Sequence, residues 1–133
     1  IADPGGAALY NYYKHGELKA EGTSITEGIG QGRITANLEG VVVDEAFRVE
    51  DKDWLPVLYS LIQDEGLSVG GSSALNVLGA MELARKLGPG KTIVTVLCDY
   101  GTRYQSKLYD PAFLLTKNLP VPPWLDGVWN QGM

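Results

Sequence analysis

Gly66–Asn76 reads GLSVGGSSALN, and this stretch decides how the chain is organised. A short apolar run leads into two glycines and two serines, and a long apolar segment follows. Gly70 and Gly71 permit a tight turn and let the backbone approach another group closely. Ser72 and Ser73 stand where a helix N-cap belongs, beside N–H groups that have no partner inside the helix. The pattern predicts a strand–turn–helix junction in which Ser72 either caps the helix or meets a ligand at the helix mouth.

Apolar residues at helical spacing predict a helix on each side of this junction. The first is expected over 53–65, with Trp54 facing the core and Gly66 as its stop. The second is expected over about 73–87 and ends firmly, because Gly88-Pro89-Gly90 cannot continue a helix. Its polar side is narrow, so we expect it to be largely buried against a sheet or another domain. Shorter helices are expected over two further ranges, 7–13 and 111–117.

Three stretches have the composition of strands. Thr92–Leu97 is a near-continuous apolar run, typical of a central parallel strand covered on both faces. Val41–Val43 is a second candidate, and Ile1-Ala2-Asp3 reads like the end of a third strand whose beginning is missing. Strands that alternate with helices indicate an α/β layered domain. Ligands of such sheets bind beyond the carboxyl ends of the strands, so the turns at 70–72 and 98–101 point to one rim.

A second unusual segment, Ser24–Arg33, carries glycines at alternate positions, namely Gly28, Gly30 and Gly32. Glycines spaced in this way suit neither a helix nor the interior of a strand. The segment is either an ordinary glycine loop or one that offers bare backbone N–H groups to a ligand or closes as a lid. It does not qualify as a dinucleotide-binding fingerprint, because no clear strand precedes it and no long helix follows.

Composition bounds the class of protein. The 133 residues suffice for one domain with a sizeable core, and with 44% hydrophobic residues disorder is not expected outside the ends. The formal net charge is −5 and Lys and Arg form no block, so neither a nucleic-acid footprint nor a basic membrane patch is visible. The single cysteine, Cys98, rules out a disulfide within the chain and suits a reducing compartment. No zinc-binding motif, P-loop, nucleophile elbow or membrane-spanning run is present.

Three further expectations concern single residues and the end of the chain. Cys98 is expected to pack in the interior, where free cysteines are commonly found. Asp99 is expected either to orient the turn or to pair with Arg103. The proline-rich residues 119–133 predict an extended tail that follows a domain of residues 1–118.

Three stretches together resemble the carboxyl-terminal part of the cysteine synthase (O-acetylserine sulfhydrylase) family. These are fold-type II pyridoxal-phosphate enzymes related to cystathionine β-synthase. Residues 25–32 and 34–37 resemble the family's substrate-side loop, usually I-Q-G-I-G-A-G-F-I-P-A-N. Residues 65–76 resemble its E-G-I-x-x-G-x-S-S-G-A stretch, and residues 96–104 resemble its strand and D-S-G-E-R-Y turn. The order and spacing of the three stretches agree, and the resemblance covers nearly the whole chain up to about Leu115.

The resemblance implies a fold, a cofactor and site residues. The fold would be α/β, part of the larger C-terminal domain of a fold-type II enzyme, with a mostly parallel sheet and helices on both faces. The cofactor would be pyridoxal 5′-phosphate. By motif, Ser72 would exchange a hydrogen bond with the pyridine nitrogen of the cofactor, and its neutral hydroxyl would favour β-elimination by leaving the electron sink weaker than a carboxylate would. Gly28, Ile29 and Gly30 would lie beside the substrate, where the backbone must approach closely.

Two residues depart from the family's pattern, and one motif is not found. Ala74 replaces the usual glycine after the serine pair, which should matter little on a helix. Tyr100 replaces the usual serine of the last turn, where it is expected to reshape the rim. No lysine of the chain matches the family's Schiff-base motif, so that lysine, the phosphate cradle and the substrate-carboxylate loop are expected upstream. We therefore expect no catalytic residue in this chain, which would be an inactive piece of a longer enzyme.

The activity that the resemblance implies is β-replacement, in which a cysteine synthase makes L-cysteine from O-acetylserine and sulfide. Two alternatives stay open: a cystathionine β-synthase-like enzyme, or a non-catalytic binding module that retains part of the fold. The implied partners are these small substrates, the missing N-terminal part of the enzyme and a second copy in a homodimer, with no metal, nucleic acid or membrane. The cytoplasm is the expected compartment, and an organelle such as the mitochondrion stays open because a targeting segment would lie upstream.

Overall fold

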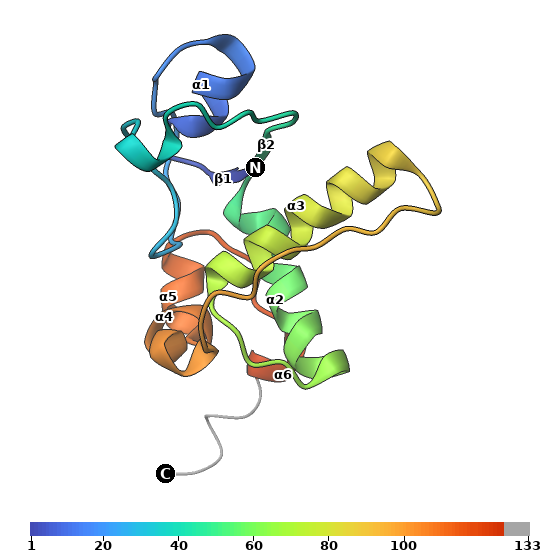
Figure 1. The fold of residues 1–133 in the computed structure, drawn as a ribbon. Coiled ribbons are helices and arrows are strands. Elements are labelled where there is room, and N and C mark those ends of the chain that lie inside the picture. The colour runs from blue at the N-terminus through green and yellow to red at the C-terminus, as the bar shows by residue number, and fades with distance from the viewer. Residues whose placement is uncertain (127–133) are drawn as a thin grey trace.

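A computed structural model describes residues 1–126, and two long helices cross at its centre (Figure 1). α2 spans Asp51–Glu65 and α3 spans Gly71–Leu87. Each helix ends at a glycine, Gly66 with φ +69° and Gly88 with φ +74°, because side chains disfavour this backbone region. Both predicted helices are thus confirmed, and each begins two residues earlier than expected.

A small parallel sheet lies against one side of α3. β1 (Ala2–Pro4) pairs with β2 (Phe47–Val49), with Ala2 opposite Phe47 and Pro4 opposite Val49. The helix and the sheet meet closely at Gly79, where a Cβ would come within 2.6 Å of the Ala2 Cβ. The strand expected at the start of the chain is confirmed. β2 was not predicted, although apolar and charged residues alternate along it.

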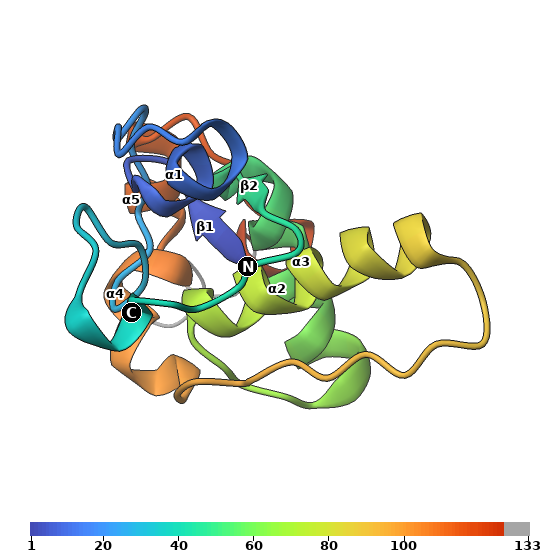
Figure 2. The ribbon, with the colours of Figure 1, turned by 45° about the horizontal axis from the view of Figure 1, so that its top comes forward.

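Shorter elements cover the remaining faces. They are α1 (Leu9–His15), the 3₁₀ turns η1 (Ala36–Leu38) and η2 (Gly101–Tyr104), α4 (Gln105–Leu108), α5 (Pro111–Thr116) and α6 (Pro123–Asp126). α4 and α5 lie beside the start of α3 in both ribbon views (Figures 1 and 2). α1 and α5 confirm the two short helices that the sequence predicted.

The tail differs from its prediction. Residues 123–126 form α6 instead of extended chain, because a proline at the first helical position has its φ already set for a helix. Leu125 of α6 is 4% exposed and belongs to the core. The rest of the predicted tail, 127–133, lies outside the described residues.

The core lies between α2, the first half of α3 and the helices that follow η2. Its largest completely buried apolar side chains are those of Trp54, Leu55, Leu58, Leu75 and Leu114. The core placement expected for Trp54 is confirmed. The burial expected for α3 holds only for its first half, since Met81 and Leu87 are exposed at 40% and 47%.

Two predicted strands do not form. Thr92–Leu97 is extended but has no strand partner, and Val94 and Val96 are 86% and 65% exposed. The segment folds back alongside α3 in both views (Figures 1 and 2). Val41–Val43 is likewise unpaired, with Val42 84% exposed. A β-branched composition gives a strand only where a neighbouring strand supplies backbone partners, and within residues 1–126 neither segment has one.

The helices are short or mixed in polarity. The longest, α3, has 17 residues, and its exposed half carries charged side chains. None of the helices in the described part of the chain combines the length and apolar character that crossing a membrane requires.

Candidate functional site

Ser72 lies in the first turn of α3. The N-cap of that helix is Gly70, and no side chain caps it, so Ser72 and Ser73 are its second and third residues. The prediction that these serines form the cap is therefore wrong. Ser72 is 5% exposed, and its hydroxyl has no hydrogen-bond partner among the residues that the structure describes. A hydroxyl in this position is available to a bound group.

Ser73, by contrast, is committed to the fold. It is completely buried, and its Oγ accepts a hydrogen bond from the backbone N–H of Cys98 at 2.8 Å. Gly70 makes a second link, because its N–H donates to the carbonyl oxygen of Asp99 at 3.0 Å. These bonds flank Ser72 and tie the first turn of α3 to the turn at 98–101. The two turns that the sequence predicted at one rim do lie together.

Of the two residues that begin the turn at 98–101, one differs from its prediction. Cys98 is exposed instead of packed, because no element of residues 1–126 covers the extended segment before it. Asp99 forms no ion pair with Arg103 and instead accepts a hydrogen bond from the Tyr104 hydroxyl at 2.5 Å. Asp99 thus orients the turn, as the other expectation had it. This hydrogen bond, with a contribution from burial, raises the pKa of the Tyr104 phenol.

A hollow of about 550 Å³ opens beside this turn. It is lined by residues 66–69 and 97–100. Tyr100 stands at its edge and is 78% exposed, so the tyrosine that departs from the family's pattern does face this rim.

The glycine loop is anchored where it begins. Asp51, the first residue of α2, accepts hydrogen bonds from the Ser24 hydroxyl at 2.5 Å and from the Ile25 backbone N–H at 2.8 Å. The same carboxylate accepts from Trp54 Nε1 at 3.0 Å. Sequence patterns did not single out Asp51 for this role, because its loop partners lie 26 and 27 positions away.

The middle of the loop lies against the carboxyl end of β1. Gly28 and Gly30 have φ angles of +73° and +89°, which side chains rarely adopt. A Cβ at Gly30 would come within 3.0 Å of both Pro4 and Ala7. Ile29 and Gly30 line a hollow of about 350 Å³ at this place.

The four predicted site residues do not share one cavity. Ile29 and Gly30 line the hollow at the end of β1, whereas neither Gly28 nor Ser72 lines it. The structure therefore brings two of them together and leaves Ser72 in the separate turn at the start of α3.

An ion pair connects the glycine loop to the element after the second turn. Glu27, which directly precedes Gly28, pairs with Lys107 of α4, and both side chains are about half exposed. The hydrogen bond from Lys107, reinforced by its charge, lowers the pKa of Glu27. No sequence pattern predicts this contact, because the two residues are 80 positions apart.

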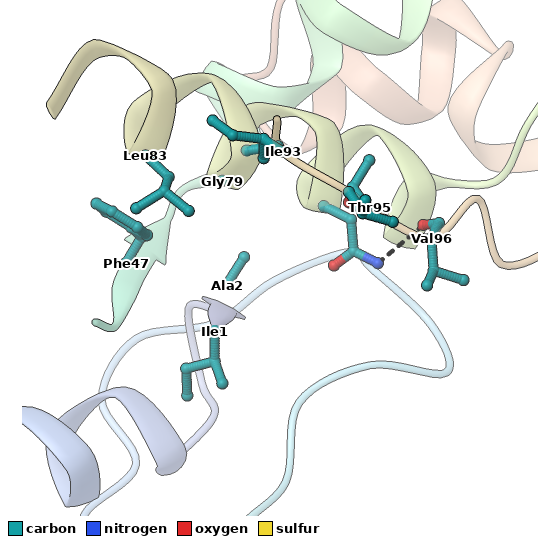
Figure 3. Close-up of a pocket in the computed structure, with 11 residues that line it drawn as sticks. Ile1, Ala2, Phe47, Gly79, Leu83, Ile93, Thr95 and Val96 are labelled. Atoms are coloured by element: carbon teal, nitrogen blue, oxygen red, sulfur yellow. Dashed lines mark hydrogen bonds between the residues drawn. The ribbon is translucent and has the colours of Figure 1, made fainter. Parts of the chain in front are cut away.

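A third hollow is apolar (Figure 3). It has a volume of about 290 Å³ and lies between the sheet, α3 and the segment 93–96. Figure 3 shows Ile1, Ala2 and Phe47 on one side of it and Ile93, Thr95 and Val96 on the other. Asn76 of α3 donates a hydrogen bond from Nδ2 to the Val96 carbonyl at 3.1 Å. No acidic or basic side chain lines this hollow, so it can pack an apolar group but cannot supply acid–base chemistry.

The residues present fit the cofactor at its pyridine end. A pyridine nitrogen needs one hydrogen-bonding group that is held still and shielded from water. Ser72 is only 5% exposed as a residue, and its hydroxyl has no partner among residues 1–126. The bonds of Gly70 and Ser73 hold the turn that carries it. Within the same range, no group of three or more His, Cys, Asp or Glu side chains is placed to hold a metal ion.

Comparisons with known proteins agree with the fold that the resemblance implies. A family model described as "Pyridoxal-phosphate dependent enzyme" matches residues 1–99. The chain is 46% identical to Cysteine synthase 1 of Neurospora crassa over 90% of the chain and 33% of that protein. It is 43% identical to Cysteine synthase 2 of Schizosaccharomyces pombe over 96% of the chain and 36% of that protein.

A solved structure is also similar. It is the crystal structure of O-acetylserine dependent cystathionine beta-synthase from Helicobacter pylori, with a TM-score of 0.69 and 28% identity. The match covers 79% of this chain and 32% of that chain. The chain thus spans about a third of the length of the relatives it matches. The family match takes in the sheet, α2, α3, the glycine loop and Ser72, and the chain belongs to the family of pyridoxal-phosphate dependent enzymes.

Proposed function

We propose that this chain is the carboxyl-terminal portion of a cysteine synthase, which replaces the acetoxy group of O-acetylserine with sulfide and forms L-cysteine. The observation that carries the proposal is Ser72, a residue that is only 5% exposed and whose hydroxyl forms no hydrogen bond in the described part of the chain. Relatives named cysteine synthase match nine tenths or more of the chain, which supports the same activity.

In this proposal Ser72 holds the pyridine nitrogen of pyridoxal 5′-phosphate. When bound, this cofactor withdraws electrons from the α carbon of an amino-acid substrate and so lets a substituent on the β carbon leave. A serine hydroxyl carries no charge, so it does not stabilise a proton on the ring nitrogen as a carboxylate would. Ser72 thereby limits the electron withdrawal, which favours departure of the β substituent over other reactions at the α carbon.

Gly28, Ile29 and Gly30 are proposed to form the substrate-side wall. Two glycines at positive φ keep the backbone free of side chains, so its N–H groups can approach a small substrate closely. The hollow beside Ile29 and Gly30 is large enough for an amino acid of the size of O-acetylserine. The hydrogen bonds of Ser24 and Ile25 to Asp51 hold the loop just before these three residues.

The proposal reaches beyond the residues of this chain. The Schiff-base lysine and the phosphate cradle would lie in the remaining two thirds of a polypeptide as long as the relatives. Residues 1–118 would belong to the cofactor-binding α/β domain, and the tail after them would be an arm packed on it through α6. The whole enzyme would act as a homodimer, in the cytoplasm or in an organelle.

A second candidate is a cystathionine β-synthase-like enzyme. The observation that favours it is the similar solved structure, whose title names an O-acetylserine dependent cystathionine beta-synthase. The first substrate would then be the same, and a thiol such as homocysteine would take the place of sulfide.

The test is an assay of the full-length polypeptide loaded with pyridoxal 5′-phosphate. It receives O-acetylserine together with sulfide or homocysteine, and the two products are quantified. Mainly cysteine supports the first candidate, and mainly cystathionine supports the second. A loss of affinity for the cofactor of about 10-fold in S72A, but not in S106A, supports the proposed contact of Ser72 with the pyridine nitrogen. Absence of both products contradicts both candidates.

A further inference from the structure

The side chains of Asp99 and Tyr104 lie directly against the backbone of Gly70, the N-cap of α3. A Cβ at Gly70 would come within 2.2 Å of Asp99 Oδ1 and within 2.7 Å of Tyr104 Cε2. The two side chains therefore occupy the space in which a side chain of residue 70 would stand, and only glycine fits there. Gly70 lies two residues before Ser72, so a group that holds Gly70 also holds the turn that carries the Ser72 hydroxyl.

Tyr104 fixes the carboxylate in this place. Its hydroxyl donates to Asp99 Oδ2 at 2.5 Å, and the residue is 8% exposed and belongs to the core. Core packing sets the position of the Tyr104 hydroxyl. A hydrogen bond to a carboxylate is charge-assisted and among the stronger kinds, so this bond fixes the direction of the Asp99 side chain.

The second carboxylate oxygen has an unusual environment. Asp99 Oδ1 is buried and has no hydrogen-bond partner among residues 1–126. It faces the N-terminal end of α3, where the free N–H groups of the first turn favour a negative charge. The carboxylate thus stabilises the first turn of the helix without capping it through a hydrogen bond.

The backbone of the same turn closes the frame. Gly101 donates its N–H to the Ser68 carbonyl at 3.1 Å, and Val69 and Tyr100 form an antiparallel bridge. Together with the bonds of Gly70 and Ser73 described above, these contacts hold the residues on both sides of Ser72. The hydroxyl of Ser72 is left unengaged at the centre of a fixed turn.

We propose that Asp99 and Tyr104 are positioning residues for Ser72. Tyr104 holds the Asp99 carboxylate against Gly70, the carboxylate steadies the first turn of α3, and the turn sets the direction of the Ser72 hydroxyl. Neither side chain touches the cofactor in this scheme. The inference rests on the proposed function, since it assigns the pair an effect on the contact between Ser72 and the pyridine nitrogen.

The test is a double-mutant cycle in the full-length polypeptide. Y104F removes only the hydroxyl that holds Asp99, and Y12F removes the hydroxyl of a tyrosine on α1 as the matched control. The readouts are the dissociation constant of pyridoxal 5′-phosphate, the fluorescence emission of the bound cofactor, and kcat and KM. Y104F should weaken cofactor binding by about 5- to 10-fold and shift the emission, whereas Y12F should change the affinity less than about 2-fold.

The cycle separates positioning from a general structural role. In the S72A background, Y104F should weaken cofactor binding no further, because its effect passes through Ser72. An equal loss of affinity in both backgrounds overturns the inference. D99N, which keeps the shape of the side chain and removes its charge, should act in the same direction as Y104F, and it serves as the test if Y104F does not fold.

Failure of the inference is distinguishable from failure of the proposed function. If S72A leaves the affinity and the emission of the cofactor unchanged, the proposed contact of Ser72 is wrong, and the positioning inference falls with it. If S72A has its expected effect while Y104F behaves like Y12F, the contact stands and only the positioning inference is overturned.

Discussion

The indole ring of Trp54 lies directly against Gly71, because a Cβ at position 71 would stand only 2.9 Å from Trp54 Cη2. Trp54 is completely buried, and its Nε1 donates to Asp51, which also anchors the glycine loop. One tryptophan therefore sets how closely α2 approaches α3 and, through Asp51, links that contact to the loop.

The contact predicts that G71A destabilises the protein. The added methyl group would collide with a completely buried ring, and such overpacking costs about 1–3 kcal/mol. The gain in helix propensity, about 1 kcal/mol at most, is smaller. G32A is the matched control, since a Cβ at Gly32 meets nothing within 4 Å and should change the free energy of unfolding by less than about 0.5 kcal/mol. Urea denaturation measures both variants, and equal stabilities would contradict the prediction.

Asp51 should contribute more to the free energy of unfolding than Asp53 does. Both carboxylates lie in the first turn of α2 and interact with the same helix dipole, but only Asp51 accepts hydrogen bonds from Ser24, Ile25 and Trp54. D51A leaves those donors unsatisfied and should lower the free energy of unfolding by about 2–3 kcal/mol. D53A, at an exposed position, should lower it by less than about 1 kcal/mol. Similar losses in the two variants would mean that the anchor contributes little.

The Glu27–Lys107 pair predicts a dependence on pH. Lys107 lowers the pKa of Glu27 below its ordinary value of 4.5, so the stability that the pair adds is present above that value. It is lost as the pH falls through the lowered pKa. In K107Q the pKa of Glu27 should return towards 4.5, which a carboxyl NMR titration measures. K52Q is the control, and a Glu27 pKa that is the same in K107Q and the parent would show that the ion pair does not form in solution.

The two neighbouring serines should respond differently to loss of their hydroxyls. Ser73 Oγ accepts from the Cys98 N–H in the interior, so S73A should lower the free energy of unfolding without cofactor by about 1–2 kcal/mol. The Ser72 hydroxyl has no partner in the described residues, so S72A should change it by less than about 0.5 kcal/mol. Chemical denaturation of the cofactor-free protein gives both values. The reverse order would show that Ser72 is a structural residue.

Local signals predicted the helices well and non-local contacts poorly. α2 and α3 follow from apolar spacing and from stop signals at Gly66 and Gly88, all of which lie within one helix length. The motif around Ser72 also pointed to the right turn, although the cap proved to be Gly70. The bond between Ser24 and Asp51 joins residues 27 positions apart, and no period in the sequence carries such a pairing.

Thr92–Leu97 shows the other limit. Its composition is that of a buried strand, but composition states only what a segment prefers once a neighbour is present. No strand among residues 1–126 pairs with Thr92–Leu97, so the segment does not form the strand that its composition favours. The burial of Cys98 was wrongly predicted as well, because the general tendency of free cysteines to be buried does not hold at a position that no element of residues 1–126 covers.

The exposed segment Thr92–Leu97 can pair with a strand of another molecule. Six residues without charge, proline or glycine, two of whose valines are 86% and 65% exposed, form a template for strand addition from another molecule. Lys91 precedes the run and Asp99 follows it closely, and charges in such flanking positions act as gatekeepers against cross-β stacking. A segment covered by other parts of a protein would not offer this template, so covering it favours folding over aggregation.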